Sequence, residues 1–70
     1  MKEITDAKIT VAAIPISELV IGGVYWNSKN EICKIIDVDN DKRQVKLLNM
    51  NEQMTVYLDF KRCVMTKRIR

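Results

Sequence analysis

Two short β-rich runs separated by a polar break constrain the fold of this chain most. The runs cover residues 21–26 and 32–38, and the break covers residues 27–31. Tyr, Trp, Ile and Val fit the pleated surface of a sheet, whereas Asn and Ser hydrogen-bond their own backbone in turns. The pattern therefore predicts a β-hairpin. It indicates a fold and points to no particular reaction.

The segment before the hairpin is predicted to contain a strand and a short turn. β-Branched residues favour a strand over residues 2–14, and Pro15 ends it because proline has no N–H to donate to a ladder. Ser17 is a suitable N-cap for one helical or 3₁₀ turn through Leu19 and Val20. Two glycines, residues 22–23, then allow the backbone to enter the hairpin.

The segment after the hairpin is predicted to form three more strands. Aspartates and an asparagine mark a reversal over residues 39–42, and a further turn lies near residues 49–52. The strands are expected over residues 44–49, 53–58 and 64–69, with a short 3₁₀ turn over 59–62 before the last one. Alternation predicts that Val45 and Leu47 share one face, and that Met54, Val56 and Leu58 point inward while Thr55 and Tyr57 point outward.

A chain of 70 residues is long enough for one domain with a modest core. The turns recur at roughly eight- to twelve-residue spacing, which favours an all-β fold. Because so few strands cannot build a sandwich, we expect a small, strongly bent five-stranded barrel. Its predicted boundaries are an N-terminal extension strand over 1–16 and a barrel over 17–70.

The order of these signals resembles that of small SH3-like barrels, in particular the Tudor-like and KOW-like branches. The resemblance covers residues 17–69 and includes the Gly-Gly-Val-Tyr-Trp run of residues 22–26. It implies a module that binds peptides, methylated side chains or nucleic acid and is no enzyme by itself. A cage for a methylated ammonium needs several aromatic faces around one point. Since Tyr25 and Trp26 are adjacent in a strand and should face opposite ways, a complete cage is not expected.

The residues that commonly carry catalysis or bind metals are scarce. The chain has no histidine and two cysteines, so a zinc site lacks ligands and the commonest general base is absent. Cys33 and Cys63 lie in apolar runs and are interpreted as buried thiols in a reducing compartment. A Cys33–Cys63 disulfide is the alternative, and it requires that neighbouring strands bring the two residues together. Asp37, Asp39 and Asp41 are interpreted as turn formers. We therefore expect no enzymatic activity, no metal and no cofactor.

Positive charge is concentrated at the C-terminal end of the sequence. The net charge is +3, and the last ten residues hold five basic side chains and no acidic one. Such an end attracts phosphate or an acidic protein face, or it is a solvated, solubilising tail. Candidate residues for binding nucleic acid or an acidic partner are Lys46, Lys61, Arg62, Lys67, Arg68 and Arg70, with aromatic contacts from Tyr25, Trp26 and Tyr57.

Apolar residues occupy both faces of the predicted strands. Ile32, Ile36 and Val38 alternate with Cys33 and Ile35, and Leu48 lies opposite Leu47, yet a barrel interior takes only one set. Either bulges rotate some of these residues inward, or the second set is covered by residues 1–14 or by another chain. Ile36 and Leu48 are thus candidate interface residues, and the extra N-terminal strand favours a homodimer.

The leading functional hypothesis is a small non-enzymatic module that occupies a surface of a larger protein. Its brevity and lack of catalytic residues suggest an inhibitor or adaptor encoded by a phage or mobile element. The alternative is a nucleic-acid-binding accessory protein that uses the basic C-terminal strand. No stretch reaches the ~18 apolar residues of a membrane span, and residues 1–8 lack the apolar core of a signal peptide. We expect a cytoplasmic protein, in the host cytoplasm if phage-encoded, with no membrane partner.

Overall fold

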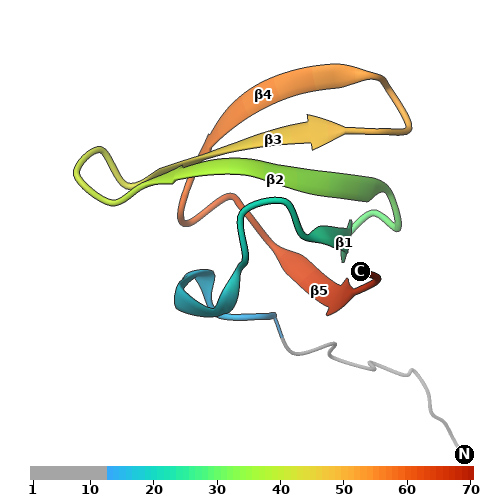
Figure 1. The fold of residues 1–70 in the computed structure, drawn as a ribbon, viewed down its shortest axis with the longest axis horizontal. Helices are drawn as coiled ribbons and strands as arrows, with labels where there is room; N and C mark the ends of the chain where they lie inside the picture. Colours follow the sequence, from blue (N-terminus) through green and yellow to red (C-terminus); the bar gives the residue numbers. More distant parts are fainter. Residues whose placement is uncertain (1–12) are drawn as a thin grey trace, which may run out of the picture.

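The computed structural model describes residues 13–70, which form one five-stranded antiparallel sheet preceded by a short 3₁₀ helix (Figure 1). The order of the strands in the sheet is β4-β3-β2-β1-β5. The predicted all-β class and the five strands are confirmed. The elements are η1 (Ile16–Glu18), β1 (Val24–Asn27), β2 (Ile32–Asp39), β3 (Gln44–Asn49), β4 (Met54–Asp59) and β5 (Met65–Arg68).

The sheet curls strongly but does not close, so the predicted barrel needs correction. β4 and β5 are its two edges, and in the described residues no ladder joins them. β5 and its neighbour β1 contain four residues each, whereas β2 contains eight, so the ladder at this edge is short. Side chains border the gap between the two edges in place of a ladder: Val56 and Leu58 on β4, Val64 just before β5 and Met65 at its start.

The three hairpin turns share one local design. Each follows a strand that ends in Asn or Asp, namely Asn27, Asp39 or Asn49, and the side-chain oxygen of that residue accepts two backbone N–H groups of the turn at 2.8–3.1 Å. Asn and Asp form such local bonds readily, which explains why the reversals were visible in the sequence. Each turn also contains one non-glycine residue with positive φ: Asn30, Arg43 or Gln53.

A β-bulge in β2 decides which of its apolar residues face the core. In the ladder with β3, Ile35 pairs with Leu47 and Asp37 pairs with Lys46, so Ile36 is the extra residue. The bulge shifts the alternation by one, so Val38 packs against the same core as Ile35. One of the two alternatives left open for the surplus apolar residues, inward rotation by a bulge, is therefore correct for Val38.

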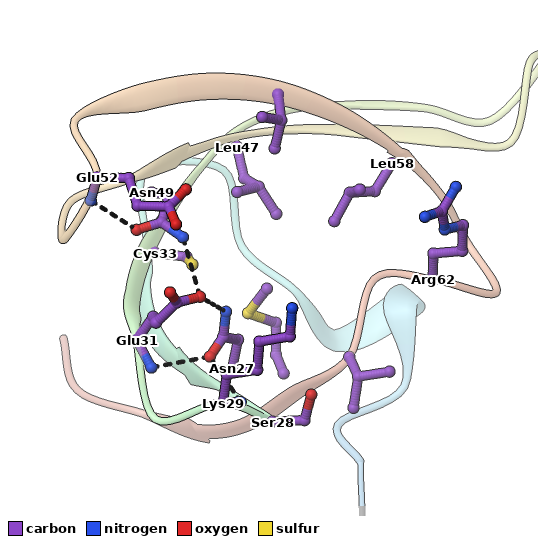
Figure 2. Close-up of a pocket in the computed structure, with 13 residues that line it drawn as sticks. Asn27, Ser28, Lys29, Glu31, Cys33, Leu47, Asn49, Glu52, Leu58 and Arg62 are labelled. Carbon is purple, nitrogen blue, oxygen red and sulfur yellow. Dashed lines mark hydrogen bonds between the residues drawn. The ribbon is translucent and has the colours of Figure 1, made fainter.

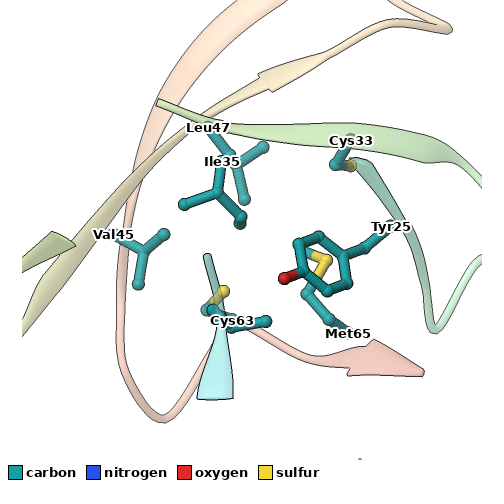
Figure 3. Close-up of a cluster of buried hydrophobic side chains, with 8 residues drawn as sticks. Tyr25, Cys33, Ile35, Val45, Leu47, Cys63 and Met65 are labelled. Atoms are coloured by element: carbon teal, nitrogen blue, oxygen red, sulfur yellow. The ribbon is translucent and has the colours of Figure 1, made fainter. Parts of the chain in front are cut away.

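The core lies on the concave face of the sheet (Figure 3). Tyr25 is 1% exposed, and its hydroxyl accepts the backbone N–H of Val20 at 2.8 Å. Gly23 permits this arrangement, since a Cβ there would lie 2.8 Å from Tyr25 Cε1 and 2.9 Å from the Val20 carbonyl oxygen. The buried cluster consists of Leu19, Tyr25, Cys33, Ile35, Val45, Leu47, Cys63 and Met65.

Several details at the ends of elements differ from the predictions. The 3₁₀ helix begins at Ile16, with Pro15 at the N-cap position and no side-chain cap, so Ser17 lies inside it and does not cap it. Met54 is 53% exposed, because it lies at the start of an edge strand; Val56 and Leu58 are half-buried, and Tyr57 points outward as predicted. Over 59–62 the chain makes a turn in which the Asp59 carbonyl accepts the N–H groups of Arg62 and Cys63.

The predicted extension strand falls mostly outside the described residues, which begin at 13. Residues 13–15 have no strand assignment, but the Ile14 N–H donates to the Met65 carbonyl oxygen at 2.7 Å, which places this segment beside β5. Over residues 13–70, every helix is too short or too polar to cross a membrane.

Cys33 and Cys63 are both buried and carry free thiols. Burial, with a smaller contribution from the neighbouring Cys33, raises the pKa of Cys63 from 9.0 to about 11. The folded protein thus holds a neutral thiol at a pH at which the unfolded chain ionises it. Stability from this group is complete below pH 9 and is lost as the pH rises toward 11.

We therefore predict that Cys63→Ala flattens the alkaline loss of stability. Wild-type protein should lose about 1–2 kcal/mol more than the variant over this pH range, because each pKa unit corresponds to about 1.4 kcal/mol. Urea unfolding at several pH values measures the two slopes. The variant is less stable at every pH because it leaves a small cavity, but equal slopes for the two proteins would contradict the prediction.

A second prediction concerns the bulge. Ile35 and Asp37 already pair with consecutive residues of β3, so deletion of Ile36 leaves every remaining side chain on its present face of the sheet. We expect this deletion to lower the free energy of unfolding by about 1–2 kcal/mol. Deletion of Lys46 from β3, whose ladder with β4 has no bulge, inverts one half of that strand and should cost about 2–5 kcal/mol or prevent folding. Urea unfolding compares the two variants, and equal costs would show that the bulge does not absorb the deletion.

Candidate binding groove

A groove of about 300 Å³ opens on the concave side of the sheet, between β4 and the start of β5 (Figure 2). It lies where a closed barrel would have its last ladder. Its walls come from the turns after β1 and β3, the inner faces of β2, β3 and β4, and the segment that leads into β5. The lining residues are Asn27, Ser28, Lys29, Glu31, Cys33, Leu47, Asn49, Glu52, Val56, Leu58, Arg62, Val64 and Met65.

The groove combines an apolar floor with a polar rim. The inward residues Leu47, Val56 and Leu58, together with Val64 and Met65, provide the floor. Polar and charged side chains from the turns form the rim, and Figure 2 shows Glu31 and Asn49 at one end with Arg62 at the other. An apolar cavity with a few placed polar groups is the usual form of a binding site.

Glu31 is the most firmly held charged group of the rim. Its Oε1 accepts hydrogen bonds from Asn27 Nδ2 at 2.9 Å and from Asn49 Nδ2 at 3.1 Å. The hydrogen bond from Asn27, followed by that from Asn49, lowers the pKa of Glu31 below its ordinary value of 4.5. Partial desolvation raises the pKa and so opposes this effect, whereas the charge of Lys29 lowers it further. The carboxylate is consequently ionised and fixed in position at neutral pH.

The same contacts join two turns that are far apart in the sequence. Asn27 and Asn49 each hold their own turn through Oδ1 and reach Glu31 through Nδ2. The backbone adds to this link, because the Met50 N–H donates to the Ile32 carbonyl at 2.8 Å. Asn49 is only 8% exposed, so its full set of hydrogen bonds matters for stability. One end of the groove is therefore built as a rigid unit.

The thiol of Cys33 lies in the groove wall and is kept protonated. Burial is the main cause of its raised pKa, the carboxylates of Glu31 and Glu52 raise it further, and a hydrogen bond with Asn27 opposes them. A protonated thiol is a poor nucleophile. The contribution of the two glutamates also indicates that their negative charges lie near this end of the groove.

The structure does not gather the predicted basic residues on one surface. Arg62 lies on the groove rim and Lys61 in the exposed turn before it. On β5, Lys67 pairs with Trp26 of β1. The guanidinium of Arg68 lies 6.0 Å from the centre of the Tyr25 ring, and the Nε of Arg68 donates to the Arg70 carbonyl oxygen. Lys46 lies on the convex face, with Nζ 5.5 Å from the centre of the Tyr57 ring.

The predicted aromatic and apolar contacts are also dispersed. Tyr25 is a core residue, Trp26 is half-buried, and Tyr57 is 64% exposed beside a second, polar hollow of about 350 Å³. Ile36 and Leu48 are half-buried; Ile36 is the bulged residue, and Leu48 pairs with Lys34 and Thr55. No aromatic residue is among those that line the groove. The role of these aromatic and apolar residues in an interface stays a prediction.

Sequence reasoning missed the residues that build the rim. Glu31, Asn27 and Asn49 were interpreted only as turn residues. One signal was available: turns after the first and third strands of an antiparallel meander lie at the same end of the sheet, so polar residues in both turns become neighbours. Among residues 13–70 no group of three or more His, Cys, Asp or Glu side chains is arranged to hold a metal ion.

The chain was compared with models of protein families, with curated proteins and with solved structures, and none of the three comparisons found a match.

We predict that Asn49→Asp raises the pKa of Glu31. Aspartate retains the Oδ1 acceptor for the turn but replaces the donor to Glu31 by a like charge. Stability relative to wild type should therefore fall as the pH rises from 3 to 7 through the titration of Glu31, and carboxyl ¹³C NMR measures its pKa directly. Asn51→Asp is the matched control, since the Asn51 side chain accepts the Ile32 N–H and the two amide donors to Glu31 are Asn27 and Asn49. An unchanged pKa in Asn49→Asp would contradict the hydrogen bond.

Proposed function

We propose that this chain is a small non-enzymatic binding module that occupies a surface of a larger protein, as an adaptor or inhibitor does. The observation that supports this function best is the groove between β4 and β5, where an apolar floor meets a rim whose one end is held in place by the contacts of Glu31. A rigid, concave surface loses little entropy on binding, which favours a partner that inserts a side chain or loop.

The titratable groups of the groove support binding over catalysis. A general base works best when its pKa is near the working pH, and a cysteine nucleophile needs a lowered pKa. Here the pKa of Glu31 is lowered and that of Cys33 is raised. Both shifts move these groups away from the values that acid–base or thiolate catalysis requires. Binding therefore uses the charge and shape of these residues and requires no bond to be made or broken.

A nucleic-acid-binding accessory protein is the second candidate. It is favoured by the pairing of Lys67 with the half-buried Trp26 across β5 and β1, which puts the two residues next to each other on one face of the sheet. Exposed Arg68 and Arg70 follow on the same edge of the sheet. Phosphate contacts from such residues supply salt-dependent affinity, and a ring adds stacking on single strands. The spread of the other basic residues over both faces makes this candidate the weaker one.

Capture of partners from the lysate of the native host, with and without nuclease, tests the proposal. Ser28 is exposed and lines the groove, so Ser28→Tyr should fill it without disturbing the core, whereas Ser17→Tyr makes the same change at an exposed serine outside it. We expect wild type and Ser17→Tyr to retain one protein after nuclease treatment, and Ser28→Tyr to retain at least about tenfold less, the equivalent of about 1.4 kcal/mol.

The remaining outcomes of this experiment separate the two candidates. Equal retention by both tyrosine variants would show that the groove is not the contact surface. Loss of every partner on nuclease treatment, or recovery of nucleic acid itself, would move the function to Lys67, Arg68 and Arg70. Mass spectrometry identifies the retained protein, and a sizing run of the protein alone reports whether it self-associates.

A further inference from the structure

We propose that the groove holds a lysine or arginine side chain of the partner protein, with the aliphatic stem on the apolar floor and the charged head at Glu31. This inference rests on the proposed function and names the chemistry of the group that the groove accepts. It is drawn from three features of the groove: the placement of its polar end, the state of the Glu31 carboxylate, and the composition of its walls.

The groove is apolar along its floor and charged at its ends, which fits an amphipathic side chain. Leu47 of β3 and Val56 and Leu58 of β4 belong to the apolar floor. Figure 2 shows Glu31 at one end of the groove. Lysine and arginine pack their methylene groups on apolar surface while the charged head reaches a polar partner. A short acidic side chain has no such stem and would leave the floor uncovered.

Glu31 is prepared to receive a cation. Both amide donors, from Asn27 and Asn49, bond to the same oxygen, Oε1, at 2.9 and 3.1 Å, so Oε2 accepts neither of them. The carboxylate is held in one position before the partner arrives, and a preorganised group contributes more to affinity than a mobile one. A charge-assisted hydrogen bond from an ammonium or guanidinium group to a carboxylate is among the stronger contacts available.

The surrounding charges favour a cation at this end of the groove. Glu52 is a second carboxylate of the rim. Glu31 and Glu52 both raise the pKa of the Cys33 thiol, which shows that their charges act at this end of the groove. Of the two basic rim residues, Arg62 stands at the opposite end (Figure 2), whereas the exposed Lys29 lies close enough to lower the pKa of Glu31 and offsets only part of the charge of the two glutamates. An anionic group of a partner placed beside Glu31 would therefore meet a like charge.

The walls also indicate which form of the cation is accepted. None of the groove residues is aromatic, so a methylated head would find no ring faces to hold it. A trimethylated ammonium has no N–H and cannot donate to the carboxylate. The groove should therefore prefer an unmodified head, which is the reverse of what an aromatic cage selects.

A titration of the full chain followed by ¹⁵N NMR tests this inference, with n-butylguanidinium and n-butylammonium as probes. We expect saturable shifts of the backbone amides of Glu31, Cys33 and Leu47. Three control probes should bind more weakly: n-butanol, which has a similar shape but no charge, butyrate, which has the opposite charge, and n-butyltrimethylammonium, which has no N–H. Glu31→Gln keeps an oxygen for the two asparagines but removes the charge, and should weaken binding of the cations roughly fivefold. Glu18→Gln, the same change on the 3₁₀ helix outside the groove, should leave binding unchanged.

Three results would overturn the inference. The first is equal midpoints in the titrations with n-butanol and with the two cations. The second is tighter binding of n-butyltrimethylammonium than of n-butylammonium. The third is identical cation binding by Glu31→Gln and wild type, with NMR spectra that show both proteins to be folded. Failure of this inference is distinguishable from failure of the proposed function. A partner protein that is lost with Ser28→Tyr but retained by Glu31→Gln would leave the binding module in place and exclude a cationic side chain at Glu31.

Discussion

The bulge at Ile36 is the constraint on which the shape of this molecule depends. β2 is the central strand and pairs with both β1 and β3, so any change in its alternation affects the whole sheet. The extra residue lets Ile35 and Val38, which have opposite parity in the sequence, face the same core. A bulge also increases local twist, which is consistent with the strong curl of the sheet around a small set of buried residues.

That curl, together with the short β1 and β5, leaves the sheet open and creates the groove. In a closed barrel, hydrogen bonds between the edge strands β4 and β5 would occupy the place where the groove lies. Here the gap is bordered by side chains, and its polar end is stabilised by Glu31, which links the turn after β1 to the turn after β3 through Asn27 and Asn49. The hydrogen bonds that hold the two turns together therefore also position the charge of the candidate binding surface.

The pKa shifts in the groove follow from the same arrangement. Two amide donors favour the ionised form of Glu31, whereas burial and the glutamates favour the neutral form of Cys33. A fixed negative charge beside an uncharged, apolar floor is the arrangement on which the proposed binding function rests.

The sequence by itself determined the strands, the turns and most of the facing of side chains, because these depend on local properties. β-Branched and aromatic runs, Asn and Asp at the strand ends, and the alternation around Val45 and Leu47 are all readable within a few residues. The tertiary structure alone decided the open edge, the bulge, the burial of Tyr25 and the meeting of Asn27, Glu31 and Asn49. These features depend on contacts between residues distant in sequence, which local propensity and alternation do not specify. The predicted basic surface illustrates the difference: residues 61–70 are continuous in the sequence, but a turn and a strand distribute their charges over different faces of the sheet.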